Sequence, residues 1–150
     1  MRKYGYIIAL TLLVVTACKK DDATEPEFTE TPHIEFVSID PGTVKELSDK
    51  FSITIKYMDG DADLGTADPD TTNLYVIDAR NQLTYKFRVR DLSPLKDAPN
   101  IQGTLKIEMP PTGVFDENAQ QETTTYSIYL FDKAGHQSNT IQTSVLTITR

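Results

Sequence analysis

The chain contains one cysteine and no tryptophan among its 150 residues. A single cysteine excludes an internal disulfide, so the folded domain must be stabilised by its core alone. Only two histidines are present, His33 and His136, and they lie far apart in the sequence. Nucleophile-elbow, His-x-x-His and phosphate-cradling glycine motifs are missing as well. These absences disfavour an enzyme, although a carboxylate pair for glycoside hydrolysis needs no fixed spacing and leaves a small hydrolase with an acidic site as an alternative.

Basic residues are also scarce relative to acids. The chain has 15 Lys and Arg against 22 Asp and Glu, which gives a net charge of −7. Such a chain lacks the positive surface with which proteins displace the counterions of phosphates, so we expect no nucleic-acid partner. Electrostatic attachment to anionic lipid is disfavoured for the same reason. Solubility and cation binding are the natural consequences of this charge.

Long apolar runs are absent except near the N-terminus. The basic start Met1–Lys3 precedes an apolar stretch, Tyr4–Val15, which is short for a membrane span and typical of a secretory signal peptide. The stretch ends in Val15-Thr16-Ala17-Cys18, which resembles the lipobox of bacterial lipoproteins. The resemblance implies that residues 1–17 are removed and that Cys18 carries a covalent lipid with several acyl chains, such as palmitate. The alternative is an ordinary signal peptide with an incidental cysteine or a buried free thiol.

Residues 18–31 are predicted to form a flexible acidic tether, because proline and charged residues dominate there. The tether begins with Lys19-Lys20-Asp21-Asp22, which is similar to the export signal that sends some Gram-negative lipoproteins to the outer leaflet of the outer membrane. This resemblance implies a lipid-anchored protein exposed on the cell surface, with the periplasmic face as the alternative. Removal of residues 1–17 leaves 13 basic and 22 acidic residues, a net charge of −9. Several acyl chains would anchor this chain stably.

Alternation of apolar and polar residues predicts one all-β domain over residues 32–150. The alternation is clearest in Phe51–Tyr57 and Leu83–Arg90. Further strands are expected at residues 34–39, 74–77, 105–109, 126–130 and 145–148. Of these, 74–77 is continuously apolar, which predicts a strand covered on both faces. No window predicts a helix, and residues 44–47 predict a single turn at most. About seven short strands separated by turns favour an antiparallel sandwich.

The last predicted hairpin contains a loop that resembles a known family. Residues 132–139 read Asp-Lys-Ala-Gly-His-Gln-Ser-Asn. They are similar to the Asp-x-Ala-Gly-Asn-x-Ser loop of bacterial immunoglobulin-like and fibronectin-III-like domains, with His136 in place of the usual asparagine. The resemblance implies an immunoglobulin-like antiparallel β-sandwich of about seven strands. A small β-barrel or a jelly roll is the alternative fold.

Acidic residues are densest after the strand that ends near Tyr57. Asp59, Asp61 and Asp63 alternate along this loop, and Asp70 follows at the twelfth position counted from Asp59. Alternate acids can direct their oxygens to one hard cation, and Ca²⁺ takes six to eight oxygens. Flanking strands and a leucine at the sixth position favour an inter-strand calcium loop over an EF-hand. The alternative is a solvated acidic turn.

An immunoglobulin-like topology would bring a further acid to this loop. The Asp59 loop then joins the second and third strands, and the loop at Asp132 joins the last two strands at the same end of the sandwich. We therefore predict a Ca²⁺ site with these ligands: Asp59, Asp61, Asp63, Asp70 and Asp132.

Two further groups of side chains are candidates for binding. Lys86, Arg88 and Arg90 share one face of their strand, because side chains two residues apart point the same way. They form either a basic stripe for an acidic glycan or partner, or a solvated face paired with acids across the strand. In the absence of tryptophan, Tyr75, Tyr129 and Phe131 are the candidates for stacking on sugar rings.

These observations predict a lipid-anchored, non-catalytic binding or assembly module of the outer membrane or cell surface, stabilised by calcium. Its expected partners are the membrane, through the lipid, and an outer-membrane protein or a glycan. The alternative is a structural subunit that docks on an outer-membrane transporter or secretion complex through an exposed strand edge.

Overall fold

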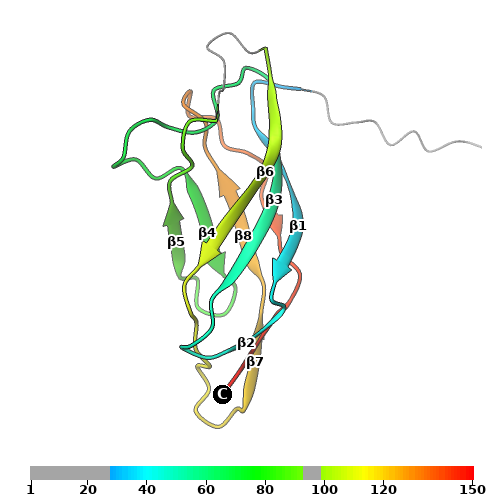
Figure 1. Ribbon diagram of the computed structural model, residues 1–150, viewed down its shortest axis with the longest axis vertical. Helices are drawn as coiled ribbons and strands as arrows, with labels where there is room; N and C mark the ends of the chain where they lie inside the picture. The colour runs from blue at the N-terminus through cyan, green and yellow to red at the C-terminus, as the bar shows by residue number, and fades with distance from the viewer. Residues whose placement is uncertain (1–27, 93–98) are drawn as a thin grey trace, which may run out of the picture.

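The computed structural model of the chain describes residues 28–92 and 99–150. The predicted signal peptide, Cys18 and the tether up to residue 27 lie outside the described residues. Within the two described ranges the structure contains ten strands and no helix (Figure 1). The strands are β1 (His33–Asp40), β2 (Thr43–Lys45), β3 (Phe51–Asp59), β4 (Leu74–Asp78), β5 (Thr84–Phe87), β6 (Ile101–Met109), β7 (Gln121–Thr124), β8 (Tyr126–Leu130), β9 (Ile141–Gln142) and β10 (Leu146–Thr149).

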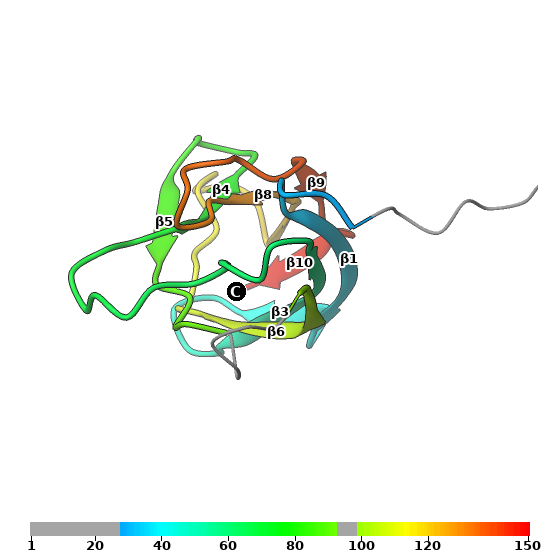
Figure 2. The same cartoon turned by 90° about the horizontal axis from the view of Figure 1, so that it is seen from above.

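The strands form an immunoglobulin-like antiparallel β-sandwich, as the sequence predicted. One layer is the sheet β1-β3-β6, and the other is β5-β4-β8-β9 (Figure 2). A third small sheet, β2-β10-β7, closes one end, and its β2–β10 pair is parallel. In three places, one pass of the chain through the sandwich is interrupted and forms two short strands: β1 and β2, β7 and β8, and β9 and β10. The ten strands therefore make seven passes.

The core lies between the two layers, and the alternate residues of the central strand β3 point into it. Ile53 and Ile55 of β3 are fully buried, and β3 pairs with β6 without a register shift over nine residues. Burial of each such side chain stabilises the fold by about 1.5–3 kcal/mol relative to exposure. The rings of Phe51 on β3 and Tyr126 on β8 lie 5.7 Å apart between centroids, so aromatic packing also joins the layers.

Three details differ from the sequence predictions. The prediction that residues 74–77 are covered on both faces was wrong, because β4 alternates between buried and half-exposed residues. Strand β5 ends at Phe87 instead of Arg90, and just beyond it the amide of Val89 donates to the side chain of Asn73 at 2.7 Å. Residues 43–45 form strand β2 before the expected turn, because Thr43 pairs with Thr147 of the distant β10.

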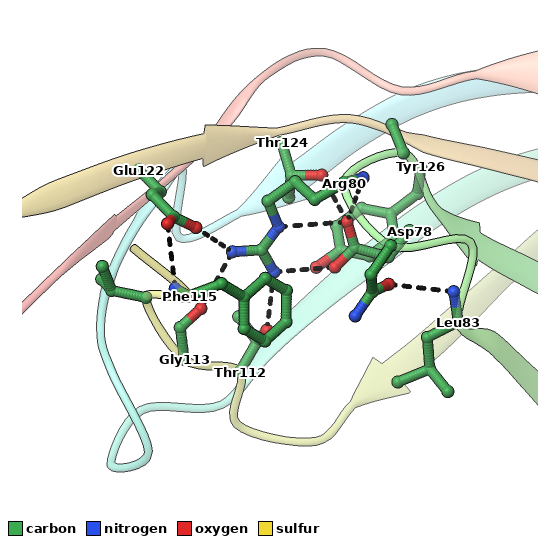
Figure 3. A network of polar contacts seen from close by, with 12 residues as sticks. Asp78, Arg80, Leu83, Thr112, Gly113, Phe115, Glu122, Thr124 and Tyr126 are labelled. Atoms are coloured by element: carbon green, nitrogen blue, oxygen red, sulfur yellow. Dashed lines mark hydrogen bonds and ion pairs between the residues drawn. The ribbon is translucent and has the colours of Figure 1, made fainter. Parts of the chain in front are cut away.

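A buried polar network fastens the end of the sandwich at which β4 finishes (Figure 3). The guanidinium of Arg80 donates to both carboxylate oxygens of Asp78, at 3.1 and 2.7 Å, and to Glu122 at 3.0 Å. It also donates to the carbonyl of Gly113 at 2.9 Å, and it lies 4.3 Å from the ring centroid of Phe115. One side chain therefore holds the loop before β7 against β4.

Candidate functional site

Three predicted acids meet at the opposite end of the sandwich, the upper end in Figure 1. Asp59 ends β3, Asp63 lies in the following loop, and Asp132 follows β8. One carboxylate oxygen from each residue lies within 4.8 Å of the others. Asp59 is 1% exposed and Asp132 is 7% exposed, whereas Asp63 is half-buried. We call these three residues the acidic cluster.

Backbone hydrogen bonds hold the first loop of the cluster in place. Asp59 Oδ2 accepts from the amide of Leu64 at 3.0 Å, which closes the loop on itself. Ala62 and Gly65 lie in the left-handed region, with φ of 58° and 100°. Leu64 between them is fully buried and anchors the loop in the core. We expect the left-handed conformation of Ala62 to reduce the stability of the fold, since residues with a Cβ rarely adopt it.

The second loop is bound directly to the first. The amide of Ala134 donates to Asp63 Oδ2 at 3.0 Å, and the amide of Lys133 donates to the Asp63 carbonyl at 3.3 Å. Asp132 Oδ1 accepts from the amide of His136 at 2.7 Å, and its Oδ2 lies 2.9 Å from Nδ1 of the same histidine. This hydrogen bond and the charge of Asp132 raise the pKa of His136.

The cluster is electrostatically strained. Burial, and then the charge of Asp61, raise the pKa of Asp59 to about 6, although the Leu64 amide opposes the shift. Burial, and then the charges of Asp132 and Asp61, also raise the pKa of Asp63. Within the described residues, Asp59 Oδ1 and Asp63 Oδ1 are buried and have no hydrogen-bond partner. The arrangement therefore has an excess of buried negative oxygens, which a cation or protons would neutralise.

The structure places the other two predicted ligands differently. Asp61 is exposed but close enough to affect the pKa of both Asp59 and Asp63. Asp70 is exposed and lies outside the acidic cluster. Its amide donates to Asp68 Oδ1 at 3.0 Å, and the Thr71 hydroxyl donates to Asp68 Oδ2 at 2.7 Å. This local turn keeps residues 68–71 at the surface, so the EF-hand-like spacing of Asp70 does not bring it to the cluster.

The three aromatic candidates form one group on the outer face of the four-stranded sheet. Tyr75 of β4 lies directly opposite Tyr129 of β8 in the strand register. Their rings stack with centroids 5.0 Å apart and an interplanar angle of 11°. Phe131 meets both rings edge to face, at 5.9 and 5.8 Å. All three side chains are partly exposed. We call this group the aromatic face.

The basic candidates of the β5 segment have different surroundings. Lys86 is exposed and lies opposite Tyr75 in the register, so it borders the aromatic face. Arg88 donates to the carbonyls of Thr66 and Ala67, at 3.2 and 3.0 Å. No salt bridge joins Lys86, Arg88 or Arg90 to an acid of residues 28–92 or 99–150. The prediction of a solvated face agrees with the exposure of Lys86 and Arg90, and, besides the hydrogen bond from Thr71, the charge of Arg88 contributes to lowering the pKa of Asp68.

Sequence reasoning missed Gly60, which lies between two acids of the loop. Its amide donates to the carbonyl of Thr29 at 2.8 Å. A Cβ at this position would lie 2.5 Å from the same oxygen, so only glycine admits this close approach. A glycine within an acidic loop could have indicated a close backbone contact, but no local sequence pattern identifies Thr29 as the partner.

No protein-family model, curated protein or solved structure matches this chain. In the two ranges that the structure covers, no helix has the length and apolarity needed to cross a membrane.

Proposed function

We propose that this chain is a lipid-anchored, non-catalytic binding module of the outer membrane that captures carbohydrate on its aromatic face. The anchor is the lipid predicted on Cys18, and the tether of residues 18–31 holds the sandwich off the membrane. The observation that carries the proposal is the clustering of Tyr75, Tyr129 and Phe131 on one outward sheet surface.

The composition of this surface supports binding. By strand alternation, the outward positions of β4, β5, β8 and β9 are these: Tyr75, Ile77, Thr84, Lys86, Ser127, Tyr129 and Gln142. None of them is acidic, although the chain has 22 acids. Because these positions carry no acid, this surface would not repel an anionic ligand, although the chain as a whole is acidic.

The chemistry of these side chains suits a sugar. Aromatic rings offer apolar surface to the C–H groups of a pyranose, and tyrosine adds a polar edge. Ser127 and Gln142 supply hydrogen-bonding groups beside the rings, and Lys86 supplies a positive charge for an acidic sugar.

An oligosaccharide array with neutral and acidic sugars tests this function. We expect binding by the wild-type chain and loss of at least about tenfold in affinity for Tyr129→Ala, the equivalent of about 1.4 kcal/mol. Phe115→Ala is the matched control, because Phe115 is an exposed aromatic residue at the other end of the sandwich. Absence of binding to every sugar, or equal loss in both variants, would contradict the proposal.

A structural subunit that docks through a strand edge is the second candidate function, and β6 favours it. Strand β6 pairs only with β3 among the described strands, and its nine residues contain no bulge and no proline. Regular unpaired edges of this length accept a further strand from a partner. Thr104→Pro would remove an exposed edge donor or distort the edge. Loss of a stoichiometric protein partner in a pull-down with this variant, but not with Tyr129→Ala, would favour docking over carbohydrate capture.

A further inference from the structure

We propose that Asp59, Asp63 and Asp132 bind one calcium ion, which joins the two end loops that hold the segment where the chain enters the sandwich. This site goes beyond the proposed function, because the aromatic face lies on the sheet surface and does not include the cluster. The ion would be a structural one, held by residues from two loops that lie far apart in the sequence.

The first argument is that buried oxygens lack partners. Asp59 is 1% exposed, yet its Oδ1 has no hydrogen-bond donor among the described residues, and Asp63 Oδ1 is in the same state. A buried acceptor without a donor destabilises a fold, and a buried carboxylate oxygen does so more strongly. Two such oxygens beside a third buried acid are the arrangement that a bound cation would satisfy.

The second argument concerns the positive charges near the cluster. Lys133 follows Asp132, but its ammonium pairs with Asp91 at 2.9 Å. His136 pairs with Asp132 at 2.9 Å, and its side chain is 43% exposed. No Lys or Arg of the described residues forms a salt bridge with Asp59 or Asp63. Among the described residues, therefore, backbone amides donate to these two acids, but no Lys or Arg side chain neutralises their charge.

The donor set favours calcium over other metals. All three candidate ligands are carboxylates, and hard oxygen donors select Ca²⁺ or Mg²⁺ over zinc and copper. The three oxygens lie within 4.8 Å of one another. An ion with oxygens at about 2.3–2.6 Å bridges that span, whereas Mg²⁺ requires about 2.0–2.1 Å and octahedral regularity. The exposed Asp61 and water are available for the remaining positions.

Calcium at this site would also restrain the start of the domain. Gly60, next to Asp59, contacts the backbone of Thr29 through a 2.8 Å hydrogen bond. Asn139, in the segment that follows Asp132, exchanges two hydrogen bonds with the backbone of Ile34, at 2.8 and 2.9 Å. Both loops of the cluster therefore hold residues 29–34. We expect calcium to slow amide hydrogen exchange in the two loops and at the Gly60 amide.

Calorimetric melting of the full chain in detergent, with CaCl₂, MgCl₂ or EDTA, tests the site. Extracellular calcium modules bind with dissociation constants of about 10⁻⁴–10⁻³ M, so the titration should extend to about 10 mM. At a tenfold excess over the dissociation constant we expect the Tm to rise by about 3–8 °C. An unchanged Tm at the highest concentration, or an equal rise with Mg²⁺, overturns the calcium site.

Variants locate the ion. Asp63→Asn should abolish the calcium-dependent rise in Tm, whereas Asp70→Asn, the matched control in the same loop, should retain it. Isothermal titration calorimetry of the wild-type chain provides a measurement that does not depend on how variants fold, and it should give one calcium per chain. Loss of the response in Asp70→Asn with retention in Asp63→Asn overturns the placement. Oligosaccharide binding is measured separately, so failure of the calcium site leaves the proposed function untouched, and the reverse also holds.

Discussion

At the scale of single residues, the buried carboxylates at the two ends of the sandwich differ in whether their oxygens have hydrogen-bond partners. Asp78 is fully buried, and it receives hydrogen bonds from Arg80 and Thr124. Asp59 is almost as fully buried and accepts from a backbone amide, but one of its oxygens has no partner in residues 28–92 and 99–150. The first acid belongs to a satisfied structural network, and the second belongs to the acidic cluster, whose buried charge a cation or protons would neutralise.

At the end of the sandwich where β4 finishes, substitution of Arg80 should lower the free energy of unfolding more than substitution of any other residue near the surface. Arg80→Met leaves Asp78 buried without its cation, so we expect the free energy of unfolding to fall by about 3–5 kcal/mol. Lys106→Met is the control, because Lys106 and Glu108 form a pair whose side chains are 64% and 66% exposed. Its loss should cost about 0–1 kcal/mol. Urea unfolding measures both, and equal effects would show that burial does not govern these pairs.

The same network predicts acid sensitivity. Burial by itself would raise the pKa of Asp78, but the hydrogen bonds from Arg80 and Thr124 outweigh it and hold the pKa below its ordinary value. Because the folded-state pKa is the lower one, the stabilisation is present above the ordinary pKa of about 3.9 and disappears as the pH falls through the depressed value. Melting of wild type and Asp78→Asn between pH 2 and 7 checks this. The difference in stability should shrink in acid, and a constant difference would contradict it.

At the scale of elements, local alternation predicted the long strands but not the short ones. Strand β3 lies where the period of two placed it, because its buried face is continuous over nine residues. Strand β2 has three residues and exists because Val44 pairs with Ile148 of β10, over one hundred residues away in the sequence. A pairing of that kind leaves no local pattern. Likewise, β4 looked fully buried because Tyr75 and Ile77 are apolar, yet both occupy its outward face.

A substitution at Gly60 tests whether its contact with Thr29 attaches the acidic loop to the start of the domain. Gly60→Ala places a Cβ 2.5 Å from the Thr29 carbonyl, so backbone must move and we expect a loss of about 1–3 kcal/mol. Gly42→Ala is the matched control, since a Cβ there meets nothing within 4 Å. Urea unfolding of the two variants measures the difference. Equal stability of both would mean that the contact between Gly60 and Thr29 does not form in solution.

At the scale of the whole molecule, topology decides which predicted site residues can meet. The Asp59 loop and the Asp132 loop were expected at one end of the sandwich, and Asp63 and Ala134 are joined there across 71 positions of the sequence. The fold class therefore predicted which two loops meet at the candidate site. Counting positions within one loop also predicted Asp70 as a ligand, but the turn at Asp68 places Asp70 at the surface, and spacing alone does not reveal that turn.

The proposed lipid anchor on Cys18 predicts how the whole chain distributes between membrane and soluble fractions. Cys18→Ser should move the protein from the membrane fraction to the soluble fraction and abolish incorporation of labelled palmitate, because stable anchoring by acyl chains requires the lipidated thiol. Tyr129→Ala, which leaves Cys18 intact, should remain in the membrane fraction. Fractionation with metabolic labelling measures both. Membrane retention of an unlabelled Cys18→Ser chain would contradict the anchor.

The most direct test of the central claim is nuclear magnetic resonance of the isotope-labelled chain during titration with an oligosaccharide selected on the array. If the aromatic face captures sugar, the amide shifts should change along β4 and β8 around Tyr75, Tyr129 and Phe131, and the sheet β1-β3-β6 should stay unchanged. Saturable changes confined to the sheet β1-β3-β6, or no changes at all, would contradict the account.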